Sequence, residues 1–199
     1  MLEFLSATNH KKKTFIEFES LLEVKIHCVG EAFTPNADIT TAKCLFDSVI
    51  NTKFSKFLGL GIEYFYLDTN MDDYKHMWLP RWIFRQYFIY ENNIEHLSIN
   101  NRILVKICKG IYGLPQAGRL AYIVLIKHLQ LHRYTRSGFT IGLFKYATGD
   151  TMFILVIDDF GVKYTAKNDA LHFIDTPKKK YPGITIDSIG RISLGIHLY

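Results

Sequence analysis

The sequence predicts an α+β protein in which helices pack on one face of an antiparallel sheet. Helical and extended patterns alternate along the 199 residues, and 48% of the residues are hydrophobic, enough to bury a core. A strand–turn–strand pattern at residues 151–166 indicates that neighbouring strands need not be parallel. This order fits helices layered on an antiparallel sheet, and a ferredoxin-like arrangement is one such solution.

The first elements are weakly patterned. Short apolar alternation before residue 30 indicates ragged strands. Within residues 34–52 a helix is predicted, which Asp38 or Thr40 can cap. Its apolar positions share one helical face: Ala42, Leu45, Phe46, Val49 and Ile50. Residues 56–67, KFLGLGIEYFYL, predict a strand that Gly59 and Gly61 weaken locally.

The middle of the chain is aromatic. A helix is expected around residues 82–90, with Trp78 and Trp82 on one packed helical face. Residues 102–114 predict a strand that ends at Gly110 or Gly113. A long helix is then expected over residues 115–134, starting at Pro115.

Residues 151–159 predict a buried strand, with residues 160–166 as its hairpin partner. Residues 169–181 predict a helix with a basic end, which the Pro182–Gly183 pair stops. Residues 191–199 predict a last strand.

Composition excludes little. The formal charge is +5 and the pI is about 9.0, which is compatible with nucleic acid without being diagnostic. Cys28, Cys44 and Cys108 show neither zinc-site nor disulfide spacing and predict a reducing, intracellular compartment. There is no secretory signal pattern, and no apolar run is long enough to cross a membrane.

Two motifs carry chemistry. Asp158 and Asp159 end a buried strand before a Phe–Gly turn, and paired carboxylates are the ligands that hard cations such as Mg²⁺ prefer. In IYGLPQAGR, residues 111–119, Gln116 would lie at a helix N-terminus, where backbone N–H groups favour anions. Either motif alone is also compatible with an ordinary polar turn or a strand-to-helix loop.

Taken together, the two motifs resemble the reverse transcriptase of copia-type LTR retrotransposons. The matching segments occur in the family's order: TPNADITTAKCLFDSVINT, FYLDTNM, KGIYGLPQAG, LVIDDFGVKY and LGIHL. The resemblance covers about residues 29–198 and implies one domain over 1–199, a polymerase palm with a partial fingers lobe. Residues 1–28 would be eroded fingers strands, and no segment matches a thumb, RNase H, protease or integrase.

The resemblance also implies roles for single residues. Asp158 is expected to be the main Mg²⁺ ligand and Asp159 an auxiliary one, both catalytic, with the backbone carbonyl of Ile62 as a further ligand. Tyr66 would pack under the sugar of an incoming nucleotide, and Gln116 would touch that nucleotide and the template region. The implied partners are an RNA template, a DNA primer and dNTP.

One position departs from the family. Where the family has the metal-bridging aspartate of the first palm strand, this chain has Gly61. Glu63 and Asp68 are too far along a regular strand to replace it, at about 6.6 Å and about 23 Å for ~3.3 Å per residue. The expectation is therefore a degenerate, inactive polymerase remnant, because losing one ligand of a cooperating site costs several orders of magnitude in rate.

Three alternatives stay open at this point. The chain could be an active polymerase in which Glu63 or Asp159 compensates. It could be a non-catalytic nucleic-acid-binding protein that uses Lys106, Lys109 and the run Lys178–Lys180 on phosphates. It could also be a globular domain whose two aspartates form a polar hairpin turn.

Overall fold

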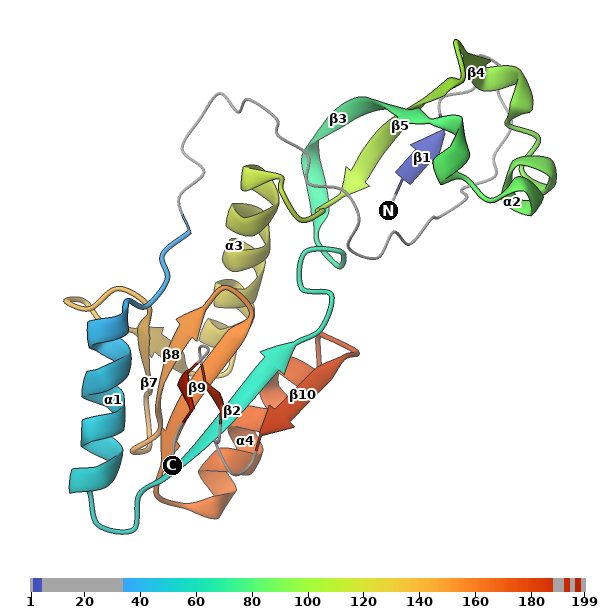
Figure 1. The fold of residues 1–199 in the computed structure, drawn as a ribbon. Coiled ribbons are helices and arrows are strands. Elements are labelled where there is room, and N and C mark those ends of the chain that lie inside the picture. The colour runs from blue at the N-terminus through green and yellow to red at the C-terminus, as the bar shows by residue number, and fades with distance from the viewer. Residues whose placement is uncertain (1, 5–33, 188–191, 194–195, 198–199) are drawn as a thin grey trace. The chain divides into compact units, whose positions relative to one another are not determined.

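The computed structural model describes residues 2–4, 34–187, 192–193 and 196–197 (Figure 1). The chain divides into two compact units. Unit 1 comprises Met1–Val29 and Tyr66–Leu120, and unit 2 comprises Gly30–Phe65 and Ala121–Tyr199. Residues 1–28, which the sequence assigns to fingers strands, lie outside the described residues apart from the short β1, Leu2–Phe4.

Unit 2 contains a six-stranded sheet with the strand order β10-β2-β9-β8-β7-β6, and every neighbouring pair is antiparallel. The strands are β2 (Lys56–Ile62), β6 (Tyr134–Arg136), β7 (Leu143–Tyr146), β8 (Met152–Val156), β9 (Asp159–Tyr164) and β10 (Ile184–Asp187). The α+β class and the pairing of β8 with β9 are confirmed, whereas β6, β7 and β10 were not foreseen. The predicted Phe–Gly turn is wrong, because Ile157 and Asp158 make the turn and Phe160 and Gly161 lie within β9.

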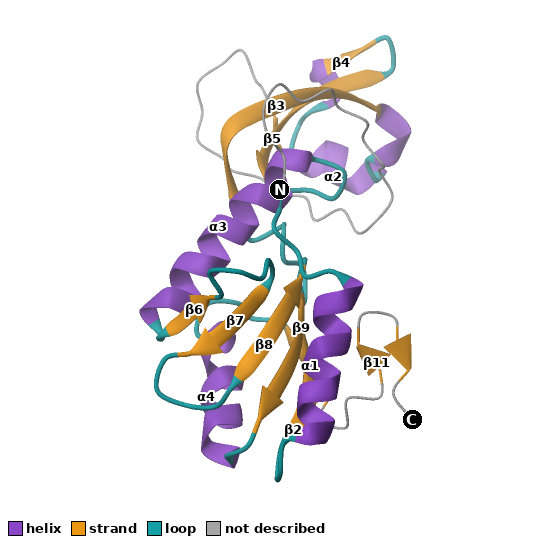
Figure 2. Ribbon diagram, turned by 90° about the vertical axis from the view of Figure 1, so that its left-hand side faces the viewer, coloured by secondary structure: helices purple, strands orange, loops and turns teal. Residues whose placement is uncertain are grey.

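The prediction that the helices share one face of the sheet is wrong for unit 2. On one face, Ala42 and Leu45 of α1 (Ile39–Asn51) pack against Ile154. On the other, Phe173 of α4 (Lys167–Lys178) packs against Phe153, the neighbour of Ile154. Because adjacent strand residues point to opposite faces, α1 and α4 lie on opposite sides of β8 and β9 (Figure 2).

The core of unit 2 on the α4 side is aromatic. Phe153 stacks on Phe144 with ring centroids 4.8 Å apart and an interplanar angle of 3°. It also contacts Phe160, Phe173 and Tyr134 at 5.6, 4.7 and 5.6 Å. Helix α3 (Pro115–Leu131) joins this side through His128, whose Nε2 lies 2.7 Å from the Thr176 carbonyl oxygen.

The α1 side carries a buried lysine. Lys163 of β9 donates hydrogen bonds from Nζ to Ser48 Oγ at 2.6 Å and to Thr52 Oγ1 at 2.8 Å. The cap of α1 is as predicted, because Asp38 accepts a hydrogen bond from the Thr41 N–H at 2.7 Å. The predicted apolar face of α1 is too wide, since Ile50 is 82% exposed at its C-terminal end.

Unit 1 contains a second antiparallel sheet. Its strands are β1, β3 (Asn70–Pro80), β4 (Ser98–Ile99) and β5 (Arg102–Lys109), with β5 pairing with all three others. The 3-10 helices Arg81–Ile83 and Glu95–Leu97 and the helix α2 (Gln86–Glu91) fill the connection from β3 to β4. Ile89, Ile103, Val105 and Ile107 are fully buried in the core of this unit.

This unit corrects two sequence predictions. Trp78 lies on strand β3 and Trp82 on a 3-10 helix, so they do not share a helical face. The long strand pattern of residues 70–80 was missed because Asp72 and Asp73 interrupt its apolar character.

The C-terminal prediction is also changed. The described residues form a separate pair of short antiparallel strands, β11 (Ile192–Ser193) and β12 (Ile196–His197), in place of one strand. No helix among the described residues is long and apolar enough to cross a lipid bilayer.

Candidate metal centre

Strand β2 brings Gly61 next to the two aspartates in unit 2. Gly61 and Asp159 are Cα partners in the antiparallel pair of β2 and β9. Beyond them, the Ile62 N–H donates a hydrogen bond to the Asp158 carbonyl oxygen at 3.0 Å. Residues about 100 positions apart in sequence therefore form one local structure at the end of the β8–β9 hairpin.

The hairpin turn itself has an unusual backbone. Val156 and Asp159 form the last pair of the ladder, so Ile157 and Asp158 make the turn. Ile157 has a φ of 59°, a left-handed conformation that a β-branched residue adopts only under constraint. In two-residue hairpin turns that position usually holds glycine or asparagine. Strain of this kind tends to occur at functional sites, where the surrounding structure holds it in place.

Asn36 supplies part of that constraint. Its Oδ1 accepts a hydrogen bond from the Ile157 N–H at 2.9 Å, and the neighbouring Ala37 N–H donates to the Leu155 carbonyl oxygen at 2.9 Å. Gly142 makes room for this segment, since a Cβ there would overlap the Ala37 backbone. The segment before α1 thus fixes the turn from outside the hairpin.

The two carboxyl groups are held in conditions that favour their neutral form. Burial raises the pKa of Asp158, and the adjacent charge of Asp159 raises it further. Burial also raises the pKa of Asp159, although much of its side chain remains in contact with solvent. No lysine or arginine of the described residues offsets either shift. A bound cation would relieve this arrangement, because an opposite charge favours the ionised form.

The position that a side chain at residue 61 would take lies next to the Asp159 carboxylate. A Cβ built on Gly61 would lie 3.0 Å from Asp159 Oδ1 and 2.8 Å from Thr185 Oγ1. Thr185 is the Cα partner of Gly61 on β10. A carboxylate at position 61 would therefore project between these two side chains, beside the aspartate pair.

Glu63 does not take the place of that missing carboxylate. The predicted strand 56–67 is too long: β2 ends at Ile62, and residues 63–68 form turns. The Glu63 side chain lies against Gly183, with Oε2 2.8 Å from the position of a Gly183 Cβ. It therefore lies beside the segment that leads into β10, whereas Asp159 belongs to β9 on the opposite side of β2.

The donor set fits a hard divalent cation only in part. Asp158 and Asp159 offer carboxylate oxygens, which Mg²⁺ prefers as ligands. The pKa values of both groups are raised, as expected for carboxyl groups that have no cation nearby. Within the described ranges, no group of three His, Cys, Asp or Glu side chains is arranged to hold a metal. The arrangement therefore has the two neighbouring carboxylates that the sequence predicts, and no carboxylate at Gly61.

Tyr66 and Gln116 lie in unit 1. Gly110 packs closely against Tyr66 and against Ala117, the neighbour of Gln116. A Cβ on Gly110 would lie 2.6 Å from the Tyr66 carbonyl oxygen and 3.0 Å from Ala117 Cβ. The Tyr66 ring packs edge-on against Tyr112, with centroids 4.8 Å apart. Gln116 Oε1 is buried and accepts no hydrogen bond from the described residues. Buried amide oxygens usually have a donor, so the Gln116 Oε1 atom departs from the usual pattern.

Sequence reasoning missed two residues of the centre. No sequence pattern singled out Asn36, which precedes α1, and Thr185 lies on β10, which no pattern had predicted. The Asn–Ala–Asp run gives a signal for a cap at Asp38 but none for a contact with a hairpin more than a hundred residues away.

Comparison of the chain with protein families, with curated proteins and with solved structures gives no match.

Asp158→Asn is expected to stabilise unit 2 at neutral pH. The folded-state pKa of Asp158 is raised above its unfolded value, so its stabilising contribution is full below about pH 3.9, the unfolded pKa, and is lost as the pH rises through the folded pKa. The variant should unfold at a higher temperature than the unaltered protein at pH 7, and the difference should vanish below about pH 3.9. Thermal unfolding across this range without divalent ions measures it. Asp150→Asn, at an exposed aspartate, is the control.

Proposed function

We propose that the chain is the fingers–palm part of a copia-type reverse transcriptase-like domain that has lost one metal ligand at Gly61. The observation that supports this most strongly is the pairing of Gly61 with Asp159 beside the strained Ile157–Asp158 turn. The family places its bridging aspartate on the strand beside its aspartate hairpin, which is the position that Gly61 has here. In this proposal unit 2 corresponds to the palm and unit 1 to the partial fingers lobe.

In this proposal the chain's own residues bind the metal ion and orient the nucleotide. The Asp158 and Asp159 carboxylates, with the Ile62 carbonyl, would hold Mg²⁺, which supplies charge stabilisation and a lowered pKa for a primer 3′-hydroxyl. Tyr66 would support the sugar of a dNTP and disfavour a ribose. The buried Gln116 Oε1 would accept a hydrogen bond from the nucleotide or the template.

The same geometry argues against appreciable polymerisation. Gly61 provides no charge, and the Glu63 carboxylate lies against Gly183 on the other side of β2. Two carboxylates beside two divalent ions leave more positive charge uncompensated than three would. Since such sites work as a unit, one missing ligand is expected to lower the rate by several orders of magnitude. The protein is therefore proposed to be a degenerate polymerase.

Primer extension tests this proposal. The purified chain is incubated with an RNA template, a DNA primer, dNTPs and Mg²⁺, and product is compared with that of an Asp158→Asn/Asp159→Asn variant. We expect both proteins to give the same background within about tenfold, because a site that already lacks a ligand has little activity to lose. Extension by the unaltered chain more than about a hundredfold above that variant would show an active polymerase with a compensating ligand.

A second function, nucleic-acid binding without catalysis, is supported by exposed cations. Lys178, Lys179 and Lys180 all reach solvent at the end of α4. Binding through such groups weakens steeply with salt because each phosphate contact releases counter-ions. This function is compatible with the first, since a polymerase remnant can keep its affinity for template after losing its chemistry.

A further inference from the structure

We propose that the solvent-exposed face of the β3–β5 sheet in unit 1 binds single-stranded nucleic acid by stacking bases on its aromatic side chains. This stacking face consists of Tyr74, His76 and Trp78 on β3 and Arg102, Leu104 and Lys106 on β5. The inference deepens the nucleic-acid part of the proposed function. It depends on none of the residues of the candidate metal centre.

The strand register places these residues on one face. His76 is the Cα partner of Lys106, and Trp78 is the partner of Leu104. Residues two apart on a strand share a face, so Arg102 belongs to the same side. Tyr74 precedes the regular part of the ladder, and its ring contact with Lys106 places it on this side. The opposite side is the core of the unit, where Leu79, Ile103, Val105 and Ile107 are almost fully buried.

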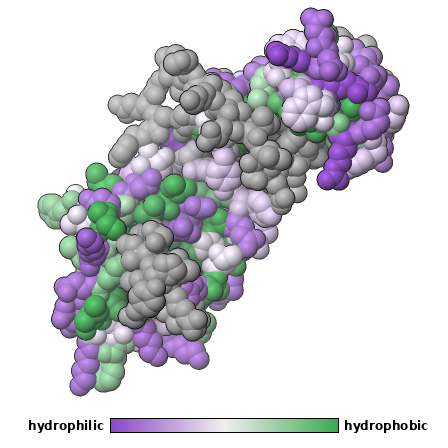
Figure 3. Space-filling model, in the orientation of Figure 1, coloured by the Kyte–Doolittle hydropathy of each residue, from purple (hydrophilic) through white to green (hydrophobic). Residues whose placement is uncertain are grey.

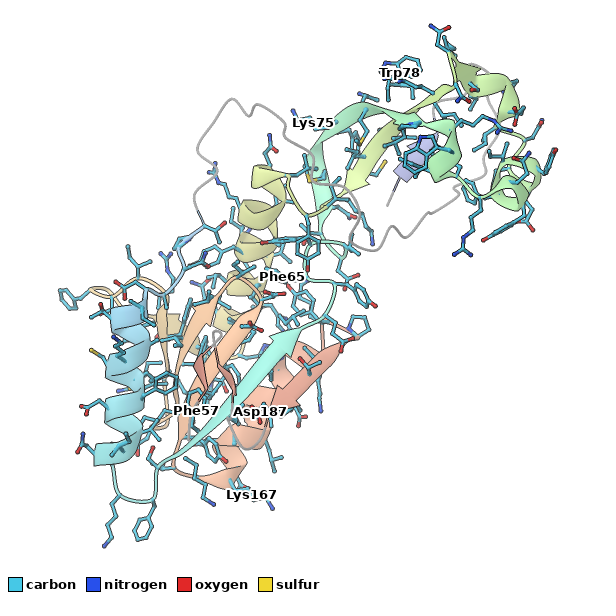
Figure 4. All side chains as sticks on the ribbon, viewed as in Figure 1. Phe57, Phe65, Lys75, Trp78, Lys167 and Asp187 are labelled. Atoms are coloured by element: carbon cyan, nitrogen blue, oxygen red, sulfur yellow. The ribbon has the colours of Figure 1, made fainter. Side chains whose placement is uncertain are left out.

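Large aromatic side chains remain open to solvent on this face. Tyr74 is 47% and Trp78 46% exposed, and Figure 4 shows Trp78 on β3. A half-exposed ring on a sheet can offer its π surface to another flat group. Stacking of a nucleic-acid base on such a ring contributes about 1–3 kcal/mol per base.

Cations accompany the rings. Lys106 Nζ lies 4.0 Å from the centroid of the Tyr74 ring, which orients the ring and places a positive charge beside it. Arg102 is exposed near the Trp78 end of the same face. Acidic residues occur nearer the other end of these strands: Glu3 of β1 is the register partner of Lys106, and Asp72 is the third residue of β3. The Trp78–Arg102 end therefore offers the most favourable charge for a phosphate backbone.

The visible face of unit 1 has no continuous apolar patch among its described residues. In Figure 3, the described residues of the upper part of the picture are mostly hydrophilic or intermediate, with scattered hydrophobic ones. Proteins that bind single-stranded nucleic acid combine aromatic side chains, which stack on the bases, with cations, which contact the phosphates. A protein partner would be expected to cover a more continuous apolar patch.

The spacing selects an extended single strand over a duplex. Side chains two apart on a strand are separated by about 6.6 Å, whereas stacked bases in a duplex are about 3.4 Å apart. Successive bases could each occupy one ring only if they were pulled out of their own stack. A duplex hides the base faces and leaves this surface only phosphate contacts.

Fluorescence anisotropy of the whole chain with labelled oligonucleotides tests the proposal. The probes are oligo-U RNA and oligo-dT of about 12 nucleotides and a duplex of equal length, at about 50 mM and about 200 mM salt. We expect both single strands to bind more tightly than the duplex. Trp78→Ala should weaken single-strand binding between about fivefold and about a hundredfold.

Matched controls are available in the same unit. Trp82, 77% exposed on a 3-10 helix, and Tyr87, exposed on α2, lie off the stacking face. Trp82→Ala and Tyr87→Ala should change affinity by less than about twofold, since an aromatic that stacks no base contributes little. In a Trp82→Phe background, Trp78 is the remaining tryptophan, so quenching of its emission by oligo-dT reports stacking directly.

The proposal is overturned if neither single strand binds, if the duplex binds as tightly, or if Trp82→Ala weakens binding as much as Trp78→Ala. Its outcome is separable from that of the polymerase proposal. Asp158→Asn/Asp159→Asn should leave single-strand affinity unchanged, while Trp78→Ala should leave the pH dependence of unit 2 unchanged.

Discussion

Gly61→Asp, combined with Thr185→Ala, is expected to tighten Mg²⁺ binding at least tenfold. Losing a group that merely supports a metal ligand costs about 10- to 100-fold in affinity, so gaining a direct carboxylate ligand should have an effect at least as large. Thr185→Ala is included because Thr185 Oγ1 lies 2.8 Å from the site of the new Cβ. The new carboxylate would project beside Asp159, and repulsion between them would destabilise the metal-free protein.

Calorimetric Mg²⁺ titration and the shift of the unfolding temperature with added Mg²⁺ measure this effect. Gly61→Asn with Thr185→Ala is the matched control, because it has the same shape without the charge. Thr185→Ala alone corrects for relief of the contact. Equal Mg²⁺ affinity in the aspartate and asparagine variants would contradict the proposed arrangement of the metal centre.

Phe153→Ala is expected to lower the free energy of unfolding of unit 2 by about 3–5 kcal/mol. Phe153 is fully buried and contacts four aromatic side chains, from β6, β7, β9 and α4. Truncation removes apolar burial and leaves a cavity among rings that cannot easily move together. The effect should be larger than that of any surface substitution in this unit.

Hydrogen exchange of the β8 and β9 amides in increasing urea follows this change in unit 2. Tryptophan fluorescence gives a separate signal, because Trp78 and Trp82 both belong to unit 1. Phe139→Ala is the control: Phe139 is fully exposed, and its loss should change stability by less than about 0.5 kcal/mol. A loss below about 1 kcal/mol for Phe153→Ala would mean that this ring cluster is not the core.

The sequence predicted the elements that have a strong local signal. The hairpin of β8 and β9, the long helix α3, and the Asp38 cap of α1 each depend on periodicity or on turn residues close in sequence. The neighbouring position of Gly61 and the aspartates was expected from the family resemblance, and the register agrees with it.

Features that depend on tertiary contacts were missed. Strand β10, ITID, alternates apolar and polar residues over only four positions. That run is too short to predict a strand by itself, and pairing with β2 defines it. Tyr74 and Trp78 were not expected on an exposed sheet face, because aromatic residues are usually interpreted as core. Glu63 could be weighed as a substitute ligand only while β2 was taken to continue past Ile62.

The pairing of β2 with β9 also has consequences for folding. Tyr66–Leu120, the larger segment of unit 1, lies in the chain between these two strands. Closing so long a loop adds little equilibrium cost, because loop entropy grows only with the logarithm of its length. Pairing of strands that are distant in sequence nevertheless slows folding. The entropy of loop closure is lost before the stabilising contacts between the strands form. A ribosome-bound nascent chain would therefore contain β2 without its partner β9 until β9 emerges, and the candidate metal centre would be among the last parts to assemble.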